Sequence, residues 1–163
     1  MSETDIITVG RALPKLRGVK PADGRYSVKV EWAEGARVGR IDVVDLAPMI
    51  VTFKVFQPLR DGTVPFERVR LGEWGASIIW PGNEDLDIGA DAIEEMAAGS
   101  MTNADFSAFL KRNKLTLDAA AVHLGIARRL VAYYAKERDI PRYIALACKE
   151  LDRSLNADVL AIA

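Results

Sequence analysis

The stretch that decides the fold covers residues 116–138, TLDAAAVHLGIARRLVAYYAKER. Apolar and small residues recur in it at helical spacing on both sides of one glycine, Gly125. The first run predicts a helix over 117–124, which Thr116 can cap with its hydroxyl. Gly125 can end that helix because glycine readily adopts a positive φ. The second run predicts another helix over 127–137.

The residues around Gly125 have the spacing of a helix-turn-helix. Ala121, four residues before the glycine, is small enough for two helices to cross closely. Ile126 and Val131 follow the glycine by one and six residues and are expected to lock the second helix onto the first. All these positions match the pattern.

The predicted second helix has an apolar face and a cationic face, as a turn of about 100° per residue places its side chains. Arginine can form bidentate hydrogen bonds with guanine in the major groove, and lysine can hold phosphates. This face and its flanks predict DNA-contacting residues, which are Arg128, Arg129, Ala132, Tyr133, Lys136, Thr116, Lys114 and Arg138.

A simpler interpretation is a solvated helix face, because exposed helices commonly carry Arg and Lys. Two residues also depart from the usual motif. Leu117 stands where a polar residue usually contacts phosphate, and Ala127 stands where Ser or Thr usually begins the recognition helix. These departures keep open an alternative, in which the chain is an interaction module that binds a partner protein and the helices are only a scaffold.

Two further helices are expected around this pair. One covers 104–112 and can be capped by Thr102 or Asn103. The other begins near Ile140–Pro141, since proline is tolerated in a first helical turn. Residues 99–163 are therefore predicted to form an all-α, helix-turn-helix domain.

Residues 1–98 have a β-rich pattern. Alternating apolar residues predict a hairpin over Tyr26–Leu46. Further strands are expected over Ile6–Leu13 and Glu73–Trp80, a short helix over Ile88–Ala98, and loops with a short helix over Val55–Arg70. The fold class is therefore α+β, with a small β-rich α+β domain before the helical one.

Charge differs between the two predicted domains. The last 64 residues carry ten Lys and Arg against seven Asp and Glu, a net +3, whereas the first 99 carry 12 against 16, a net −4. This difference favours two units with different partners. We expect the helical domain to bind double-stranded DNA as a homodimer, with a small protein as a possible second partner.

The chain also resembles a known family in both parts. The helical residues resemble the lambda-repressor-like (Xre/Cro-type) segment attached to some members of domain-of-unknown-function family 2442, and the N-terminal part resembles that family's own domain. The matching segments are Gly125–Tyr134, Ile140–Cys148, Tyr26–Leu46, Val55–Asp61, Phe66 and Ile79–Asp87. The resemblance implies an α+β domain joined to a DNA-binding domain, no enzymatic activity, and toxin–antitoxin or autoregulatory roles.

Other chemistry has little support in the sequence. Cys148 is the single cysteine, which fits a reducing cytoplasm, and His123 is the single histidine, so a zinc site is not expected. The acidic run Glu84–Asp87 lacks the spacing of a calcium loop. Neither a signal peptide nor an apolar stretch of about 20 residues is visible. We therefore expect no enzyme, cofactor, metal or membrane association, and a cytoplasmic location.

Overall fold

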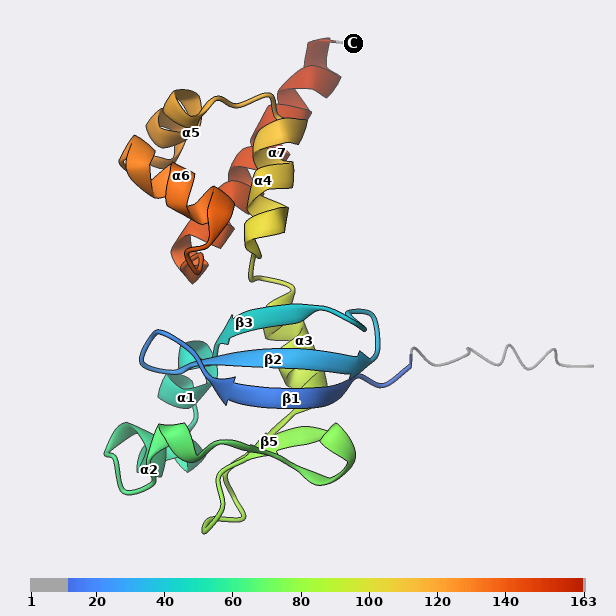
Figure 1. Ribbon diagram of the computed structural model, residues 1–163, viewed down its shortest axis with the longest axis vertical. Helices are drawn as coiled ribbons and strands as arrows, with labels where there is room; N and C mark the ends of the chain where they lie inside the picture. The colour runs from blue at the N-terminus through green and yellow to red at the C-terminus, as the bar shows by residue number, and fades with distance from the viewer. Residues whose placement is uncertain (1–11, 163) are drawn as a thin grey trace, which may run out of the picture.

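A computed structural model describes residues 12–162, with side chains up to residue 157. Strands occupy the sheet-bearing part, residues 12–98, and helices make up the helical part, residues 99–162 (Figure 1). The chain is therefore of the mixed α+β class, as the sequence predicts. Within residues 12–162, no helix has the length and apolarity needed to cross a membrane.

Sheet A is antiparallel with the order β1-β2-β3. Its strands are β1 (Lys15–Pro21), β2 (Ser27–Glu34) and β3 (Ile41–Asp45). The pairing of β2 with β3 confirms the predicted hairpin. In β2 the side chains of Val28, Val30 and Trp32 are fully buried, because alternate residues of a strand face the same side. The sequence pattern did not reveal β1.

Short elements and a second sheet follow. They are α1 (Ala47–Thr52), η1 (Lys54–Phe56), α2 (Gln57–Arg60), η2 (Phe66–Arg68), β4 (Arg70–Leu71), η3 (Glu73–Gly75), β5 (Ser77–Ile79), β6 (Asp87–Gly89) and α3 (Ala90–Ala97). Sheet B is antiparallel with the order β4-β5-β6. The expected loops and short helical turns over 55–70 are present.

The predicted strand over 73–80 is wrong in its first half. Residues 73–75 form η3 instead, and Trp74 adopts a positive φ of 58° with its side chain 86% exposed. A Cβ on Gly75 would collide with the backbone of Leu16, so only glycine fits where η3 approaches β1. The predicted helix over 88–98 is also shorter, since Ile88 belongs to β6.

The predicted strand over 6–13 lies mostly outside the described residues. Residues 6–11 are not described, and Ala12 and Leu13 belong to no strand.

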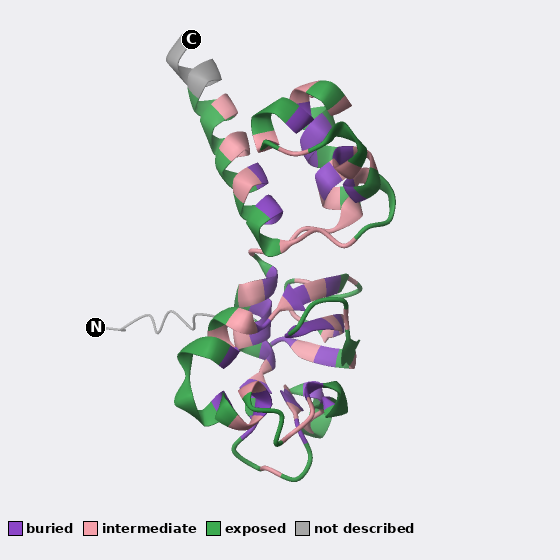
Figure 2. Ribbon diagram, turned by 90° about the vertical axis from the view of Figure 1, so that its left-hand side faces the viewer, coloured by how far each residue is buried: buried purple, intermediate pink, exposed green. Residues whose placement is uncertain are grey.

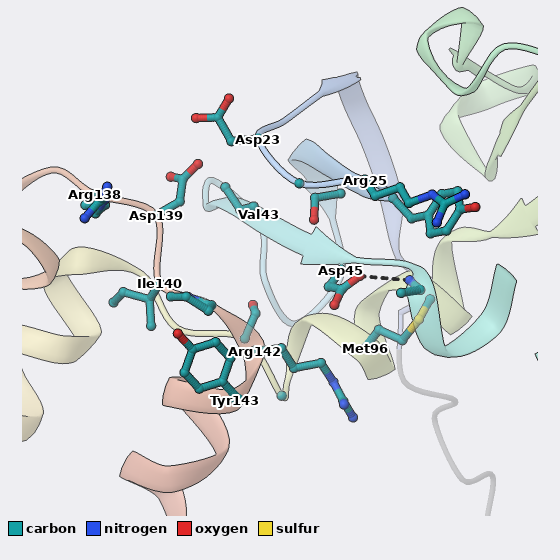
Figure 3. A pocket seen from close by; sticks show the side chains of 17 residues that line it. Asp23, Arg25, Val43, Asp45, Met96, Arg138, Asp139, Ile140, Arg142 and Tyr143 are labelled. Atoms are coloured by element: carbon teal, nitrogen blue, oxygen red, sulfur yellow. Dashed lines mark hydrogen bonds between the residues drawn. The ribbon is translucent and has the colours of Figure 1, made fainter. Parts of the chain in front are cut away.

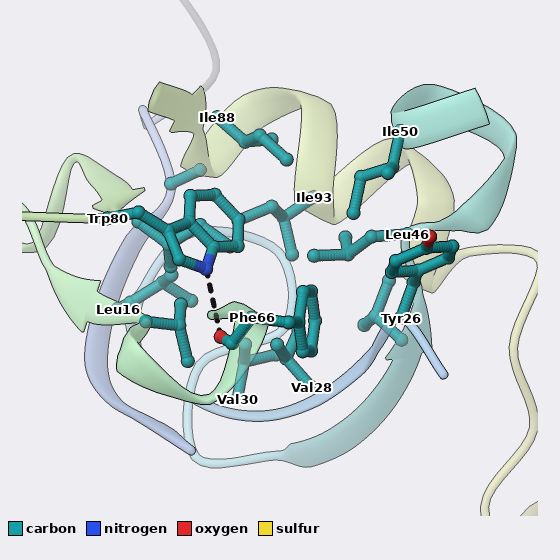
Figure 4. Packing of buried hydrophobic residues seen from close by; sticks show 14 of the residues in the cluster. Leu16, Tyr26, Val28, Val30, Leu46, Ile50, Phe66, Trp80, Ile88 and Ile93 are labelled. Atoms are coloured by element: carbon teal, nitrogen blue, oxygen red, sulfur yellow. Dashed lines mark hydrogen bonds between the residues drawn. The ribbon is translucent and has the colours of Figure 1, made fainter. Parts of the chain in front are cut away.

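The sheet-bearing part has its own hydrophobic core (Figure 4). Phe66 lies edge-on to Tyr26, with ring centroids 5.8 Å apart, and the indole of Trp80 donates a hydrogen bond to the Phe66 carbonyl at 2.9 Å. Trp32 donates to the buried carboxylate of Asp42 at 2.8 Å. Trp32 and Trp80 are thus core residues, as expected for a small β-rich unit, whereas Trp74 is not.

The helical part contains four helices, which enclose a second hydrophobic core (Figures 1 and 2). They are α4 (Asn103–Arg112), α5 (Leu117–Leu124), α6 (Arg128–Lys136) and α7 (Arg142–Ile162). Phe106 and Phe109 of α4 are fully buried in this core. Each predicted helix is present: α5 has the predicted bounds, and the starts of the other three and the end of α6 differ from the predicted positions by one or two residues. α4 begins with a capping box between Thr102 and Asp105.

Candidate nucleic-acid interface

The corner between α5 and α6 is built on Gly125. Thr116 caps α5 by accepting a hydrogen bond from the Ala119 amide at 3.1 Å. Gly125 then ends α5 in the left-handed region, with φ 67° and ψ 32°, as predicted. The Ile126 amide reaches back to the Ala121 carbonyl at 3.1 Å, the bond that closes a Schellman motif. The chain therefore reverses within a few residues and enters α6.

One face of α6 packs against the rest of the helical part. Val131 is fully buried and Tyr134 is 4% exposed, and the Tyr134 ring lies edge-on to Phe106 at 6.0 Å. Ile126 and Leu130 are half-buried against the same core. This apolar face agrees with the sequence interpretation and fixes the direction in which the opposite face points.

Two polar residues of α4 hold the C-terminal end of α6, and sequence reasoning did not single them out for this role. The Asn103 amide donates to the carbonyls of Tyr134, at 2.8 Å, and Arg138, at 2.7 Å. Ser107 donates to the Ala135 carbonyl at 2.9 Å. These bonds satisfy carbonyls that a helix end leaves unpaired. Their partners are backbone atoms more than 25 residues away, so no local spacing signal could have revealed them.

The predicted contact residues on α6 gather on the exposed side of this helix. Arg128, Arg129 and Lys136 are exposed, Tyr133 is 41% exposed, and Ala132 is half-buried. No acidic residue lies within α6, so the described helix presents only positive charge. We call these five residues the α6 front face. It combines cations with a small residue and one aromatic ring.

The other predicted contact residues flank the α6 front face in sequence. Lys114 and Thr116 are exposed in the α4–α5 connection, where Lys114 adopts a positive φ of 53°. Arg138 follows α6 and places its guanidinium 5.7 Å from the centre of the Tyr133 ring, a distance that allows a cation–π interaction. The structure thus brings Arg138 onto the α6 front face.

Two arginines begin α6, where the helix dipole disfavours positive charge by roughly 0.3–1 kcal/mol. Ala127 offers no side-chain cap there. Asp118 of α5 partly compensates, since its carboxylate lies 3.1 Å from Nε of Arg128. Both side chains of this ion pair are more than half exposed, so it contributes little to stability. The positive charges at the start of α6 therefore slightly destabilise this helix, and an anion bound there would offset them.

Other reactive groups lie apart from this face. Cys148 is buried in the helical core, and burial raises the pKa of its thiol to about 11, which keeps it protonated and unreactive. His123 is exposed on α5. Among residues with described side chains, no three His, Cys, Asp or Glu gather as metal ligands.

Comparison with known proteins yields one structural likeness. No protein-family model matches the chain, and no curated protein matches it. Among solved structures, the chain is similar to one from Nitrosomonas europaea described as a "putative DNA binding protein", with 33% sequence identity over 83% of this chain and 84% of that one. The TM-score of this match is 0.42.

Proposed function

We propose that the chain is a DNA-binding transcription regulator that inserts α6 into the major groove. The observation that carries this proposal is the exposed cationic face of α6 opposite a packed apolar face, at a left-handed glycine corner. The major groove of B-DNA is wide enough to admit a helix presented in this way.

The cations of the α6 front face, together with Arg138, have two proposed roles. Arg128 and Arg129, in the first turn, reach base edges, because the N-terminal residues of a recognition helix lie deepest in the groove. Lys136 and Arg138, at the other end, hold phosphates. Ala132 lets the backbone approach the bases. On binding DNA, Arg128 would exchange its ion pair with Asp118 for a contact with a base or phosphate. The exchange costs little, because the ion pair is exposed.

The finer features of this proposal are a helix-turn-helix domain over residues 99–163 and a homodimer. One small domain covers few base pairs, so two copies on half-sites about 34–36 Å apart would supply affinity and specificity. The domain over residues 1–98 would then carry dimerisation or regulation. The proposal includes no enzymatic activity and no cofactor.

A binding titration with the DNA upstream of the chain's own gene tests this proposal. Arg128→Ala combined with Arg129→Ala should remove preference for that DNA over an unrelated duplex. Arg68→Ala combined with Arg70→Ala is the matched control, because both arginines are exposed and lie in the sheet-bearing part. Unchanged sequence preference in the α6 variant would show that the assigned contact face is wrong.

A second candidate function is binding to a partner protein, in the manner of an antitoxin. Large apolar side chains are exposed from the end of α1 into η1, where Val51 is 60%, Phe53 is 53% and Val55 is 45% exposed. Adjacent exposed apolar groups are typical of protein-binding surfaces. Phe53→Ser should abolish co-purification with the neighbouring gene's product under this candidate, whereas the DNA titration should not change.

A further inference from the structure

A cleft of about 720 Å³ lies between the two parts of the chain (Figure 3). The β1–β2 turn and the end of β3 form one wall, the α6–α7 connection forms the opposite wall, and Met96 near the end of α3 contributes to the lining. Its volume falls within the roughly 300–1,000 Å³ of small-molecule sites. Apart from Arg138, the proposed function uses no residue that lines this cleft.

The cleft is lined by three arginines that pair with no carboxylate among the described residues. These are Arg25, Arg138 and Arg142. Arg25 instead stacks over the ring of Tyr26 at 5.1 Å. Several other arginines of the chain do form ion pairs, as Arg37 does with Asp42 at 2.7 Å. The guanidinium groups of the cleft therefore remain available to an anion.

Three aspartates line the same cleft, and none forms an ion pair with a described residue. These are Asp23, Asp45 and Asp139. Asp45 accepts a hydrogen bond from the Ala47 amide at 2.9 Å, which uses one of its oxygens. The carboxylates of Asp23 and Asp139, from opposite parts of the chain, lie toward one side of the cleft, and Arg142 extends on the other (Figure 3). Positive and negative groups thus face a shared space without neutralising one another.

Apolar side chains lie between these charges. Ile140 and Tyr143 project from the α6–α7 connection and the start of α7, and Met96 lies across from them (Figure 3). The Tyr143 side chain is 67% exposed, so its ring is free to cover an apolar group. The cleft therefore offers an apolar surface together with the carboxylates of Asp23 and Asp139 on one side and the Arg142 guanidinium on the other.

We propose that this cleft binds a small zwitterion of the α-amino acid class. Asp23 and Asp139 take its ammonium group, Arg142 takes its carboxylate, and Tyr143 with Ile140 covers its side chain. A ligand with both charges satisfies both sides at once, whereas a simple anion leaves the aspartates repelling it. The proposal does not depend on DNA binding, because none of these residues belongs to the α6 front face. Its test also contains no DNA.

Isothermal titration calorimetry of the full chain with each of the 20 standard L-α-amino acids tests this inference. At least one is expected to bind saturably with one site per chain. Its decarboxylated amine and its deaminated acid should each bind at least about tenfold more weakly, since each loses one charge-assisted contact.

Variants locate the binding. Arg142→Gln and Asp139→Asn should each weaken the binding by about tenfold. Arg68→Gln and Asp85→Asn, which change exposed charges outside the cleft, should leave the affinity unchanged. Circular dichroism melting confirms that all four variants fold. Absence of binding by every amino acid at millimolar concentration, or unchanged affinity in both cleft variants, would overturn the proposal.

Discussion

Arg40 of the β2–β3 connection lies 2.8 Å, from Nη2 to Oδ2, from Asp105 of α4, and this ion pair joins the sheet-bearing part to the helical part. Asp105 also accepts a hydrogen bond from the Thr102 amide in the capping box of α4. Burial raises the pKa of Asp105, but the bonds from Thr102 and Arg40 outweigh it and the net pKa is lowered. One carboxylate thus both caps a helix and anchors it to the sheet.

The double role of Asp105 predicts unequal effects of removing either partner. Arg40→Ala should lower the free energy of unfolding by no more than about 1 kcal/mol, as for other partly exposed pairs. Asp105→Ala should cost about 1 kcal/mol more than that, because the capping box is lost as well. A double-mutant cycle in urea measures their coupling. A coupling energy of zero would show that the pair does not hold the two parts together.

The left-handed conformation of Gly125 predicts a backbone effect without steric collision. An added Cβ would meet no atom within 4 Å, so the cost of Gly125→Ala comes only from the positive φ. We expect a loss of about 1 kcal/mol, and a smaller loss for Gly125→Asn, since asparagine tolerates this region better. Thermal unfolding of both variants checks this order. Equal stability of Gly125→Ala and the wild type would contradict the left-handed conformation of Gly125.

Acid should weaken the contact between α4 and α7. Arg112 donates two hydrogen bonds to the carboxylate of Asp152, and Asn113 donates one, so the pKa of Asp152 is lowered below 3.8. A lowered folded-state pKa means that this stabilisation is complete above the unfolded value and is lost as pH falls through the folded value. Denaturation at a series of pH values falling from about 5 should therefore show wild type and Asp152→Asn converging in stability.

The control for that experiment is Asp85→Asn, which removes one exposed negative charge from the sheet-bearing part. Its stability difference from the wild type should not show the same convergence. If Asp152→Asn behaves like this control at every pH, the contact with Arg112 contributes nothing to folding.

The two hydrophobic clusters predict two unfolding units if the proposed domains are independent. Phe106 is fully buried in the helical cluster, and Phe106→Ala should cost about 3–5 kcal/mol there. Calorimetry should show one transition shifted to lower temperature and the transition of the sheet-bearing part unchanged. A single transition that shifts as a whole would show that the chain folds as one unit.

The helical part could be predicted closely because its signals are local. Thr116 as a cap, Gly125 as a left-handed stop, and the apolar period through Val131 all act within one or two helical turns. The same helical spacing of apolar residues also predicted which side of α6 is exposed. The packing of α6 against α5 could be predicted as well, because only a short turn at Gly125 connects the two helices.

The sheet-bearing part was predicted less completely because its decisive contacts are distant in sequence. The strand β1 has no regular alternation, since register shifts interrupt its pairing with β2. Trp74 lies in the segment 73–80 that was predicted to be a strand, yet Gly75 must approach the backbone of Leu16, which turns the chain there. The charged side chains of the cleft, and the hydrogen bonds from Asn103 to the end of α6, likewise depend on residues that only the folded chain brings together.

The most direct test of the central claim measures whether the first turn of α6 reads guanine. Once a bound duplex is known, replacing a guanine by 7-deazaguanine removes the N7 acceptor from the major groove without changing base pairing. The wild type should lose about 1–3 kcal/mol of binding free energy at one or more guanines. The variant with Arg128→Ala and Arg129→Ala should lose nothing further at the same positions. A wild type that binds every substituted duplex with unchanged affinity would contradict the account.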